Sequence, residues 1–284
     1  MLGMLVLDYC GRDRVRSVVS PLDAGATPGM AAAGLHASRI VHLERAFNLR
    51  DLGGLRTMDG RRVRRGKVYR SDDPFHASSE DVAILRSLGI ATVLDLRTAE
   101  ECAERGSATW EGLGAMVHAC PLVEVVPSPT EHGNYVEPPA TAGLYVEMLT
   151  ADTSRHARMW QTLAEASTGV TIIHCWSGRD RTGIVVALLL ELLGVEEDDI
   201  VEDYAMSTPG MTRMLDWAER NLPGGINEVT GNRTAMGTTW PETMRLFLAE
   251  FRDRYGSAAE YMRKLGLQAQ IEVLRSNLLE PIRN

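Results

Sequence analysis

The stretch from residue 171 to residue 183 reads TIIHCWSGRDRTG, an apolar run followed closely by a cysteine, a glycine and an arginine. The apolar run is typical of a short buried strand, and the nearly apolar residues 184–193 suit a helix packed against a sheet. Cys175 therefore stands in a loop between a strand and a helix. In a parallel sheet such loops lie at the carboxyl ends of the strands, where ligands bind.

The loop has the residues of an anion site. The free N–H groups at the start of a helix favour an anion, and together with the Arg181 guanidinium they stabilise a thiolate, so Cys175 is a candidate nucleophile. Gly178 lets the backbone curl without a side chain in the way. The planar fork of Arg181 can pair with two oxygens of a phosphate.

Two other interpretations of the loop are weaker. A nucleoside-triphosphate loop needs a lysine after its second glycine, where this chain has Ile184. A purely structural Cys175 leaves the order of Cys, Gly, Arg and Thr at this junction unexplained. His174, in contrast, is interpreted as a hydrogen-bonded residue that shapes the loop and not as a proton carrier.

Outward from the loop, the pattern alternates between strands and helices. Residues 78–88 open on serines that can cap a helix and stop at Gly89, and the strand ATVLDLR follows. We also predict two short strands around an Asp59–Gly60 turn and a helix over 143–167. These elements predict an α/β fold of three layers, in which helices flank a central, mainly parallel sheet.

The domain organisation is predicted to be simple. Residues 1–38 mix Gly, Ala, Pro and Ser without a sustained period, which indicates a poorly ordered or irregular N-terminal extension. Residues 39–284 are expected to form a single domain. Within it, residues 223–240 form either a flap over the pocket or a plain surface loop.

Composition narrows the classes of partner. The formal net charge of −8 gives no overall reason to bind nucleic acid or an anionic membrane, so an anionic substrate must be held locally. The basic run 61–67 is interpreted as a solvated hairpin face. No stretch is apolar enough to span a bilayer and no basic leader opens the sequence, so we expect no stable membrane anchor.

The cysteines point to a reducing compartment. Those at positions 10, 102, 120 and 175 form no CxxC pair and no cluster with histidine at zinc spacing. We therefore expect neither a disulfide framework nor a metal site. Reduced thiols fit a cytoplasmic location best.

The stretch HCWSGRDRTG resembles the HCxxGxxR[ST] signature of the cysteine-dependent phosphatases of the protein-tyrosine phosphatase superfamily. Five further stretches are similar, in the same order, to the atypical bacterial tyrosine phosphatase family, which also acts on phosphoinositides: FNLRDLGG, GKVYRSDD, LGIATVLDLRTAEE, IVEDYAMS and YMRKLGL. The resemblance covers roughly residues 40–267 and implies a cysteine-phosphatase-like fold.

The resemblance also implies a mechanism, the hydrolysis of phosphate monoesters without metal or cofactor. Cys175 would attack phosphorus to form a cysteinyl-phosphate, while Arg181 and the loop N–H groups hold the oxygens. Thr182 would hydrogen bond the departing thiolate. The implied phosphate- and substrate-binding residues are Trp176, Ser177, Gly178, Arg179, Asp180 and Arg181 of the loop, together with Asn48, Arg50, Asp51 and Arg70.

Two aspartates compete for the role of the acid that protonates the leaving oxygen. Asp95 ends a strand, so it faces the same sheet edge as Cys175, whereas Asp180 lies within the loop. We expect Asp95 to be the acid and Asp180 to support the loop or to activate water. The alternative role for Asp95 is a salt bridge with Arg97 or Arg50.

The substrate stays open at this point. The related family usually has a lysine, linked to the binding of extra phosphate groups, where this chain has Arg179, which keeps the charge but changes the geometry. A phosphoprotein, a phosphoinositide and a small phosphorylated metabolite all offer the same phosphoryl group. Two alternatives to a phosphatase are a catalytically silent phosphate-binding module, which the intact Cys175, Arg181 and Thr182 argue against, and sulfur transfer.

Overall fold

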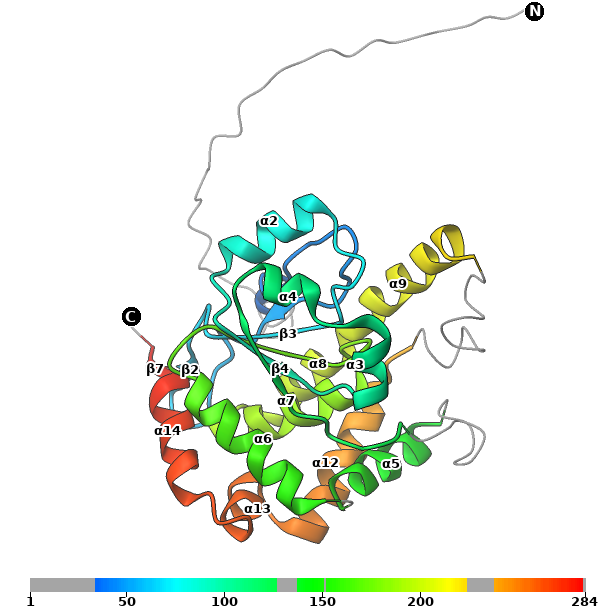
Figure 1. Cartoon of the computed structure of the whole chain (residues 1–284). Helices are drawn as coiled ribbons and strands as arrows, with labels where there is room; N and C mark the ends of the chain where they lie inside the picture. The colour runs from blue at the N-terminus through cyan, green and yellow to red at the C-terminus, as the bar shows by residue number, and fades with distance from the viewer. Residues whose placement is uncertain (1–33, 127–136, 151, 224–237, 283–284) are drawn as a thin grey trace, which may run out of the picture.

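A five-stranded sheet lies at the centre of the computed structural model, which describes residues 34–126, 137–150, 152–223 and 238–282 (Figure 1). The strand order is β1-β3-β6-β4-β5. Only β1 runs antiparallel to its neighbour β3, and all other pairs are parallel. The mainly parallel sheet predicted from the sequence is therefore confirmed.

The strands are short, and the four parallel ones, β3, β6, β4 and β5, end together at one edge. Their bounds are β1 Arg50–Asp51, β3 Val68–Ser71, β6 Thr171–His174, β4 Thr92–Asp95 and β5 Met116–Ala119. In the register, Asp95 at the end of β4 stands opposite His174 at the end of β6. The loops that follow these strands therefore meet at one edge of the sheet.

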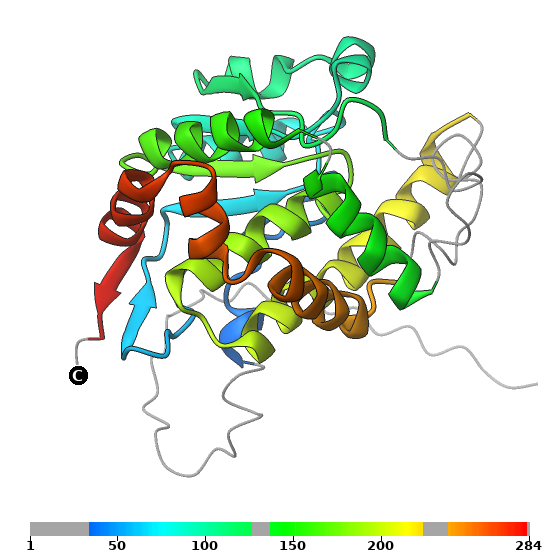
Figure 2. The same ribbon diagram turned by 90° about the horizontal axis from the view of Figure 1, so that it is seen from below.

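Helices cover both faces of the sheet (Figure 2). On one face α6 (Thr153–Ala166) packs against β4, and on the other α7 (Asp180–Leu193) packs against β6 and β3. The apolar residues of α7 are all buried, in agreement with their continuous hydrophobic run. The other helices are α2 Ser79–Ser87, α3 Ala99–Arg105, α4 Ala108–Gly112, α5 Pro138–Thr150, α8 Glu197–Ala205, α9 Ser207–Asn221, α12 Pro241–Tyr255, α13 Ala258–Lys264 and α14 Gln268–Leu278.

A separate two-stranded sheet joins the two ends of the domain. β2 (Arg61–Val63) pairs antiparallel with β7 (Leu279–Pro281), and these strands lie side by side in Figure 2. The predicted turn before β2 is present, because Gly60 has a φ of 80°. The strand predicted before this turn, however, contributes only an isolated bridge between Arg56 and Arg62. The main partner of β2 therefore comes from the other end of the chain.

Helix ends follow local side-chain chemistry. Ser78 caps α2 in a reciprocal capping box with Asp81, which confirms the predicted start of that helix. The single helix predicted over 143–167 is wrong, because α5 ends at Thr150 and α6 starts at Thr153. The Asp152 side chain accepts hydrogen bonds from the first N–H groups of α6, so it begins a new helix there.

The predicted extension and flap fall largely outside the described residues, which exclude 1–33 and 224–237. Near the proposed boundary at residue 38, His36 is buried and its Nε2 lies 3.0 Å from Asp199 Oδ1 on α8. No helix in the described ranges is both long enough and apolar enough to cross a membrane.

Candidate active site

Cys175 lies in the loop between β6 and α7, with 1% of its surface exposed. Three loop carbonyls accept hydrogen bonds from residues outside the loop. The pairs are Asp73 N to Trp176 O at 3.0 Å, Asn48 Nδ2 to Ser177 O at 3.0 Å, and Arg70 Nη2 to Gly178 O at 2.7 Å. This outer set of donors fixes the direction of each peptide group in the loop.

The opposite side of the loop keeps its donors available. Within the described part of the chain, the N–H groups of Trp176, Ser177 and Gly178 meet no protein acceptor. The Thr182 hydroxyl is fully buried and likewise has no hydrogen-bond partner among those residues. Buried polar groups are normally paired, so these donors fit an anionic ligand held by the loop.

Gly178 is required by the shape of the loop. Its φ of 68° lies in the left-handed region, which side chains disfavour. A Cβ atom at this position would stand 2.3 Å from the Ser71 carbonyl oxygen at the end of β3. The sequence prediction that this glycine lets the backbone curl is confirmed, and the close approach to β3 is a second reason for it.

Arg181 is bound by Glu101, a residue that was not predicted from the sequence as part of the site. Its guanidinium donates two hydrogen bonds to the Glu101 carboxylate on α3, the one from Nη2 to Oε1 measuring 2.7 Å. Burial acts to lower the pKa of Arg181, but its hydrogen bonds to the Glu101 carboxylate outweigh burial and raise the pKa above its usual value. Sequence alone marks Glu101 only as the third residue of a helix cap begun by Thr98.

Asp95 is held in a salt bridge at the end of β4. The Arg97 guanidinium donates to both carboxylate oxygens, at 2.9 Å from Nε to Oδ1 and 2.6 Å from Nη2 to Oδ2. Burial acts to raise the pKa of Asp95, but the charged hydrogen bonds from Arg97 outweigh it, so the pKa lies below its usual value. The salt bridge raised from sequence as the alternative role of this residue is therefore present.

Asp180 belongs to a second polar group at the start of α7. Arg179 Nε lies 3.1 Å from both of its carboxylate oxygens, and the Tyr145 hydroxyl donates to Oδ1. Burial acts to raise the pKa of Asp180, but Arg179 and Tyr145 bring it below its usual value. Its side chain is 28% exposed, compared with 2% for Asp95. Asp180 is thus the more accessible of the two carboxylates.

A buried ion cluster supports the loop from beneath. Asp203 on α8 lies 2.8 Å from Arg39, 3.3 Å from Arg50 and 2.6 Å from Arg70. Burial acts to raise the pKa of Asp203, but the three arginines outweigh it and hold the pKa far below its usual range. Three cations around one anion leave two positive charges in excess, which favours an anion in the adjoining loop.

The remaining predicted residues sit at different distances from the loop. Asn48 contacts it directly, and Arg50 reaches it through Asn48, to which it donates from Nη1. Asp51 instead accepts from the N–H groups of Gly53 and Gly66, at 2.8 and 2.9 Å, so it braces two turns. No hydrogen bond joins Asp51 to the loop among the described residues.

His174 uses both ring nitrogens in hydrogen bonds. Nε2 lies 3.1 Å from the Trp110 Nε1–H, and Nδ1 lies 3.1 Å from the Cys175 carbonyl. Since the indole can only donate, Nε2 accepts and Nδ1 carries the proton. Burial lowers the pKa of His174, which keeps the ring neutral. These bonds confirm the structural role predicted for this residue.

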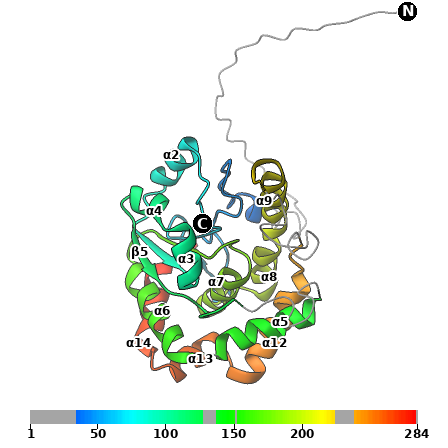
Figure 3. The same ribbon diagram turned by 45° about the vertical axis from the view of Figure 1, so that its right-hand side comes forward.

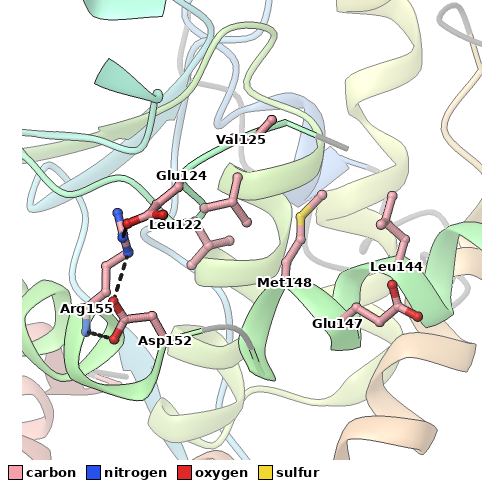
Figure 4. Close-up of a pocket in the computed structure, with 9 residues that line it drawn as sticks. Leu122, Glu124, Val125, Leu144, Glu147, Met148, Asp152 and Arg155 are labelled. Atoms are coloured by element: carbon pink, nitrogen blue, oxygen red, sulfur yellow. Dashed lines mark hydrogen bonds and ion pairs between the residues drawn. The ribbon is translucent and has the colours of Figure 1, made fainter. Parts of the chain in front are cut away.

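A cavity of about 360 Å³ lies apart from these residues, between the segment that follows β5 and helices α5 and α6 (Figure 4). Leu122 and Met148 give it an apolar wall, and Arg155 reaches across its edge to Glu124 and Asp152. None of the residues predicted from the loop signature lines it. The candidate site is therefore the loop itself.

Comparison with known proteins identifies a family of the same chemistry. The model of the tyrosine phosphatase family matches residues 41–280. A Cupriavidus necator protein named as a tyrosine-protein phosphatase is 34% identical over 184 residues, which cover 62% of this chain and 66% of that protein. The triple specificity protein phosphatase PtpB of Mycobacterium tuberculosis is 28% identical over 280 residues, covering 84% of this chain and 98% of PtpB.

Among solved structures, P. aeruginosa TpbA matches with a TM-score of 0.31 at 17% sequence identity, covering 67% of this chain and 91% of TpbA.

Proposed function

This chain belongs to the tyrosine phosphatase family, and from that premise we propose that it hydrolyses phosphate monoesters through a cysteinyl-phosphate on Cys175. The observation that carries the proposal is the division of the loop into two sides. On one side, the loop carbonyls accept hydrogen bonds from the Asp73 N–H and from the side chains of Asn48 and Arg70. The N–H groups of Trp176, Ser177 and Gly178 and the Thr182 hydroxyl have no partner among the described residues and so remain available to a ligand.

In the first step, Cys175 Sγ forms a bond to phosphorus while the bond from phosphorus to the ester oxygen breaks. The loop N–H groups and the Arg181 fork hold the three phosphoryl oxygens, because hydrogen bonds to charge that develops in the transition state lower the barrier. Arg181 uses one N–H of Nη1 and one of Nη2 on Glu101, so its Nε–H and the second N–H of Nη2 can donate to the phosphate. Glu101 keeps the guanidinium at the loop before the substrate arrives.

In the second step, a water oxygen bonds to phosphorus and the bond from phosphorus to sulfur breaks. The carboxylate that protonated the leaving oxygen in the first step takes a proton from this water, inorganic phosphate leaves, and the thiolate of Cys175 is restored. The buried Thr182 hydroxyl, which has no partner among the described residues, can donate its hydrogen bond to that thiolate. This assignment uses the one hydroxyl of the loop region that is both buried and unpaired.

The leaving oxygen needs a proton, and we assign its delivery to Asp180. The Asp180 side chain is 28% exposed at the loop, whereas Asp95 is fixed on Arg97 by two charged hydrogen bonds. A bound phosphate dianion raises the pKa of a neighbouring carboxyl group, which favours the protonated form of Asp180. Asp95 as the acid is the competing assignment, and the two are separated experimentally in the Discussion.

Phosphate release tests the proposal. The wild-type protein should release phosphate from aryl phosphates without added metal, and a chelator should leave the rate unchanged. Cys175→Ser should abolish turnover yet still bind phosphate-like anions, because the hydroxyl is not ionised at neutral pH. The matched variant Cys120→Ser, which makes the same change away from the loop, should keep its activity. Retained hydrolysis in Cys175→Ser would overturn the covalent mechanism.

The same assay identifies the substrate class. Phosphopeptides, phosphoinositides, nucleotides and sugar phosphates should be compared by kcat/KM under identical conditions. On family membership we expect phosphotyrosyl substrates to lead this panel. A metabolite that exceeds them by tenfold or more would assign the protein to a small-molecule pathway with the same chemistry.

A further inference from the structure

Aromatic rings form a continuous arc whose two ends adjoin the candidate phosphate loop. Ring contacts join Phe75 to His76 at 4.8 Å, His76 to Trp217 at 4.6 Å, and Trp217 to Phe47 at 6.2 Å between centroids. We call these four residues the aromatic arc. They come from the segment after β3, from α9 and from the segment before β1, and α9 can be followed in Figure 3.

One end of the arc meets the loop through Arg105 at the end of α3. The Arg105 guanidinium lies 3.4 Å from the centroid of the Trp176 ring and 5.3 Å from that of Phe75. Trp176 directly follows Cys175, so this stack places the arc beside the nucleophile. Cation–π stacking orients the indole ring as well as attracting it.

The other end meets the loop through Phe47. The next residue, Asn48, donates to the Ser177 carbonyl at 3.0 Å. Arg213 of α9 lies 5.8 Å over the Phe47 ring and donates from Nη2 to the Phe47 carbonyl at 3.0 Å. The arc thus begins and ends at residues adjoining the loop, with a guanidinium over a ring at each end.

The exposure of the arc distinguishes it from a core cluster. Phe75 has 46% of its surface exposed, although the preceding Pro74 is buried. Phe47, His76 and Trp217 are half-buried. Large exposed rings grouped beside a site usually mark a surface for a partner, so the arc presents ring faces that a substrate can cover.

We propose that the aromatic arc binds the polypeptide on either side of a phosphotyrosine whose phosphate occupies the loop. This inference rests on the proposed function and names its substrate class. A tyrosine ring can cover only one step of the arc, and an extended chain rises about 3.3 Å per residue. Each of the successive steps, 4.8, 4.6 and 6.2 Å, is longer than this rise, so the arc extends over several residues of an extended peptide. Arg105 and Arg213 suit acidic side chains near the phosphotyrosine.

The test compares a phosphotyrosyl peptide of about ten residues, with acidic flanking side chains, with N-acetyl phosphotyrosine amide, which has the same leaving group and no flanks. In the wild type, kcat/KM for the peptide should exceed that for the amide by about tenfold or more. Phe75→Ala should reduce this ratio about threefold to tenfold, because one ring contact is lost. The amide should be hydrolysed at the wild-type rate.

Matched variants control for unrelated effects. Met58→Ala removes an exposed apolar side chain and should leave the ratio unchanged. The backbone N–H of Met58 donates to the Gly194 carbonyl, which lies at the end of α7 far from the loop. Trp217→Phe keeps a ring in the arc and should retain more of the ratio than Trp217→Ala, with thermal unfolding used to confirm that both are folded. Arg213→Ala should lower the ratio only for the acidic peptide, whereas Arg254→Ala on α12 should not.

A ratio near one in the wild type, or an equal ratio in the wild type and Phe75→Ala, would overturn the arc as a peptide surface while leaving the phosphatase assignment intact. Loss of hydrolysis for every substrate would count against the proposed function. In that case binding of the same peptide to Cys175→Ser and to Cys175→Ser with Phe75→Ala still decides the question. Equal affinities of the two variants would overturn the arc, and a weaker affinity of the second would support it.

Discussion

Arg181 at the start of α7 is bound by Glu101 on α3 through two parallel hydrogen bonds. These residues are 80 positions apart, and their side chains are 7% and 16% exposed. A guanidinium held in this way has lost most of its rotational freedom before a substrate arrives, so less entropy is lost on binding phosphate.

Arg181→Lys and Glu101→Gln should therefore differ in severity. The lysine keeps the charge but loses the fork, so kcat should fall on the order of a hundredfold or more, while phosphate binding weakens less. Glu101→Gln keeps the shape but loses the charged partner, and kcat should fall about tenfold. Steady-state kinetics with an aryl phosphate measure both. An undiminished kcat in Glu101→Gln would show that the pair does not position Arg181.

The roles of Asp95 and Asp180 can be distinguished by how the effect of each substitution on the rate depends on the leaving group. Asp180→Asn should slow an alkyl phosphate far more than an activated aryl phosphate, because protonation matters most for a basic leaving oxygen. Asp95→Asn breaks the fork with Arg97 and should slow both substrates to a similar degree, with a loss of stability. The reverse pattern in kcat/KM would assign the acid to Asp95.

Alkylation should distinguish the cysteines. Burial raises the pKa of both Cys102 and Cys120 to about 11, so these thiols stay protonated at pH 7. Iodoacetate at neutral pH should therefore modify Cys175 first, and inorganic phosphate should protect it. Peptide mapping after partial labelling gives the order. Equal modification of Cys102 and Cys175 would contradict the assignment of Cys175 as the nucleophile.

Asp203 should make the protein sensitive to acid. Its pKa is depressed in the folded state, so its stabilising effect is complete above the unfolded value of about 3.9 and is lost as the pH falls below it. Asp203→Asn leaves three buried arginines without their carboxylate and should lower the free energy of unfolding by about 3–5 kcal/mol at pH 7. Urea unfolding at pH 7 and near pH 3 checks this. The difference between variant and wild type should shrink at the lower pH, and an unchanged difference would contradict the prediction.

Gly178→Ala should damage the loop more than the fold as a whole. The methyl group meets the Ser71 carbonyl, and the left-handed φ adds strain, so the peptide group that faces the phosphate must shift. Activity should fall by about a hundredfold or more. Gly60→Ala is the control, because Gly60 also has a positive φ but has open space around it and lies far along the chain from the loop. Equal losses of activity in the two variants would argue against a specific role of the loop geometry.

The part of the site that could be predicted from sequence is contiguous in the chain. One loop and the helix start that follows it hold four of the site residues: Cys175, Gly178, Arg181 and Thr182. Their spacing in the sequence is enough to predict that they lie together, whatever the rest of the fold. The sheet was predictable for a similar reason, because buried strands such as Thr171–His174 are marked by short apolar runs.

The residues that hold this loop could not be predicted in the same way. Arg70 and Asp203 are 133 positions apart, and Arg181 and Glu101 are 80 positions apart. No local pattern records such pairs, because they arise only when the sheet aligns the ends of its strands. The prediction of a single helix over 143–167, where the structure has α5 and α6, failed for another reason. Asp152 lies within the stretch predicted as one helix, but its side chain caps the start of a new one.

The pairing of β2 with β7 also bears on how the protein is made. Arg62 bonds to Glu280, which follows it by 218 positions. During synthesis, which proceeds at about 5–20 residues per second, β2 therefore has no strand partner until residues 279–281 have emerged from the ribosome. A nascent chain arrested before that point keeps an unpaired strand edge, to which another chain can add. This small sheet, and with it the domain, is therefore complete only after residues 279–281 have been made.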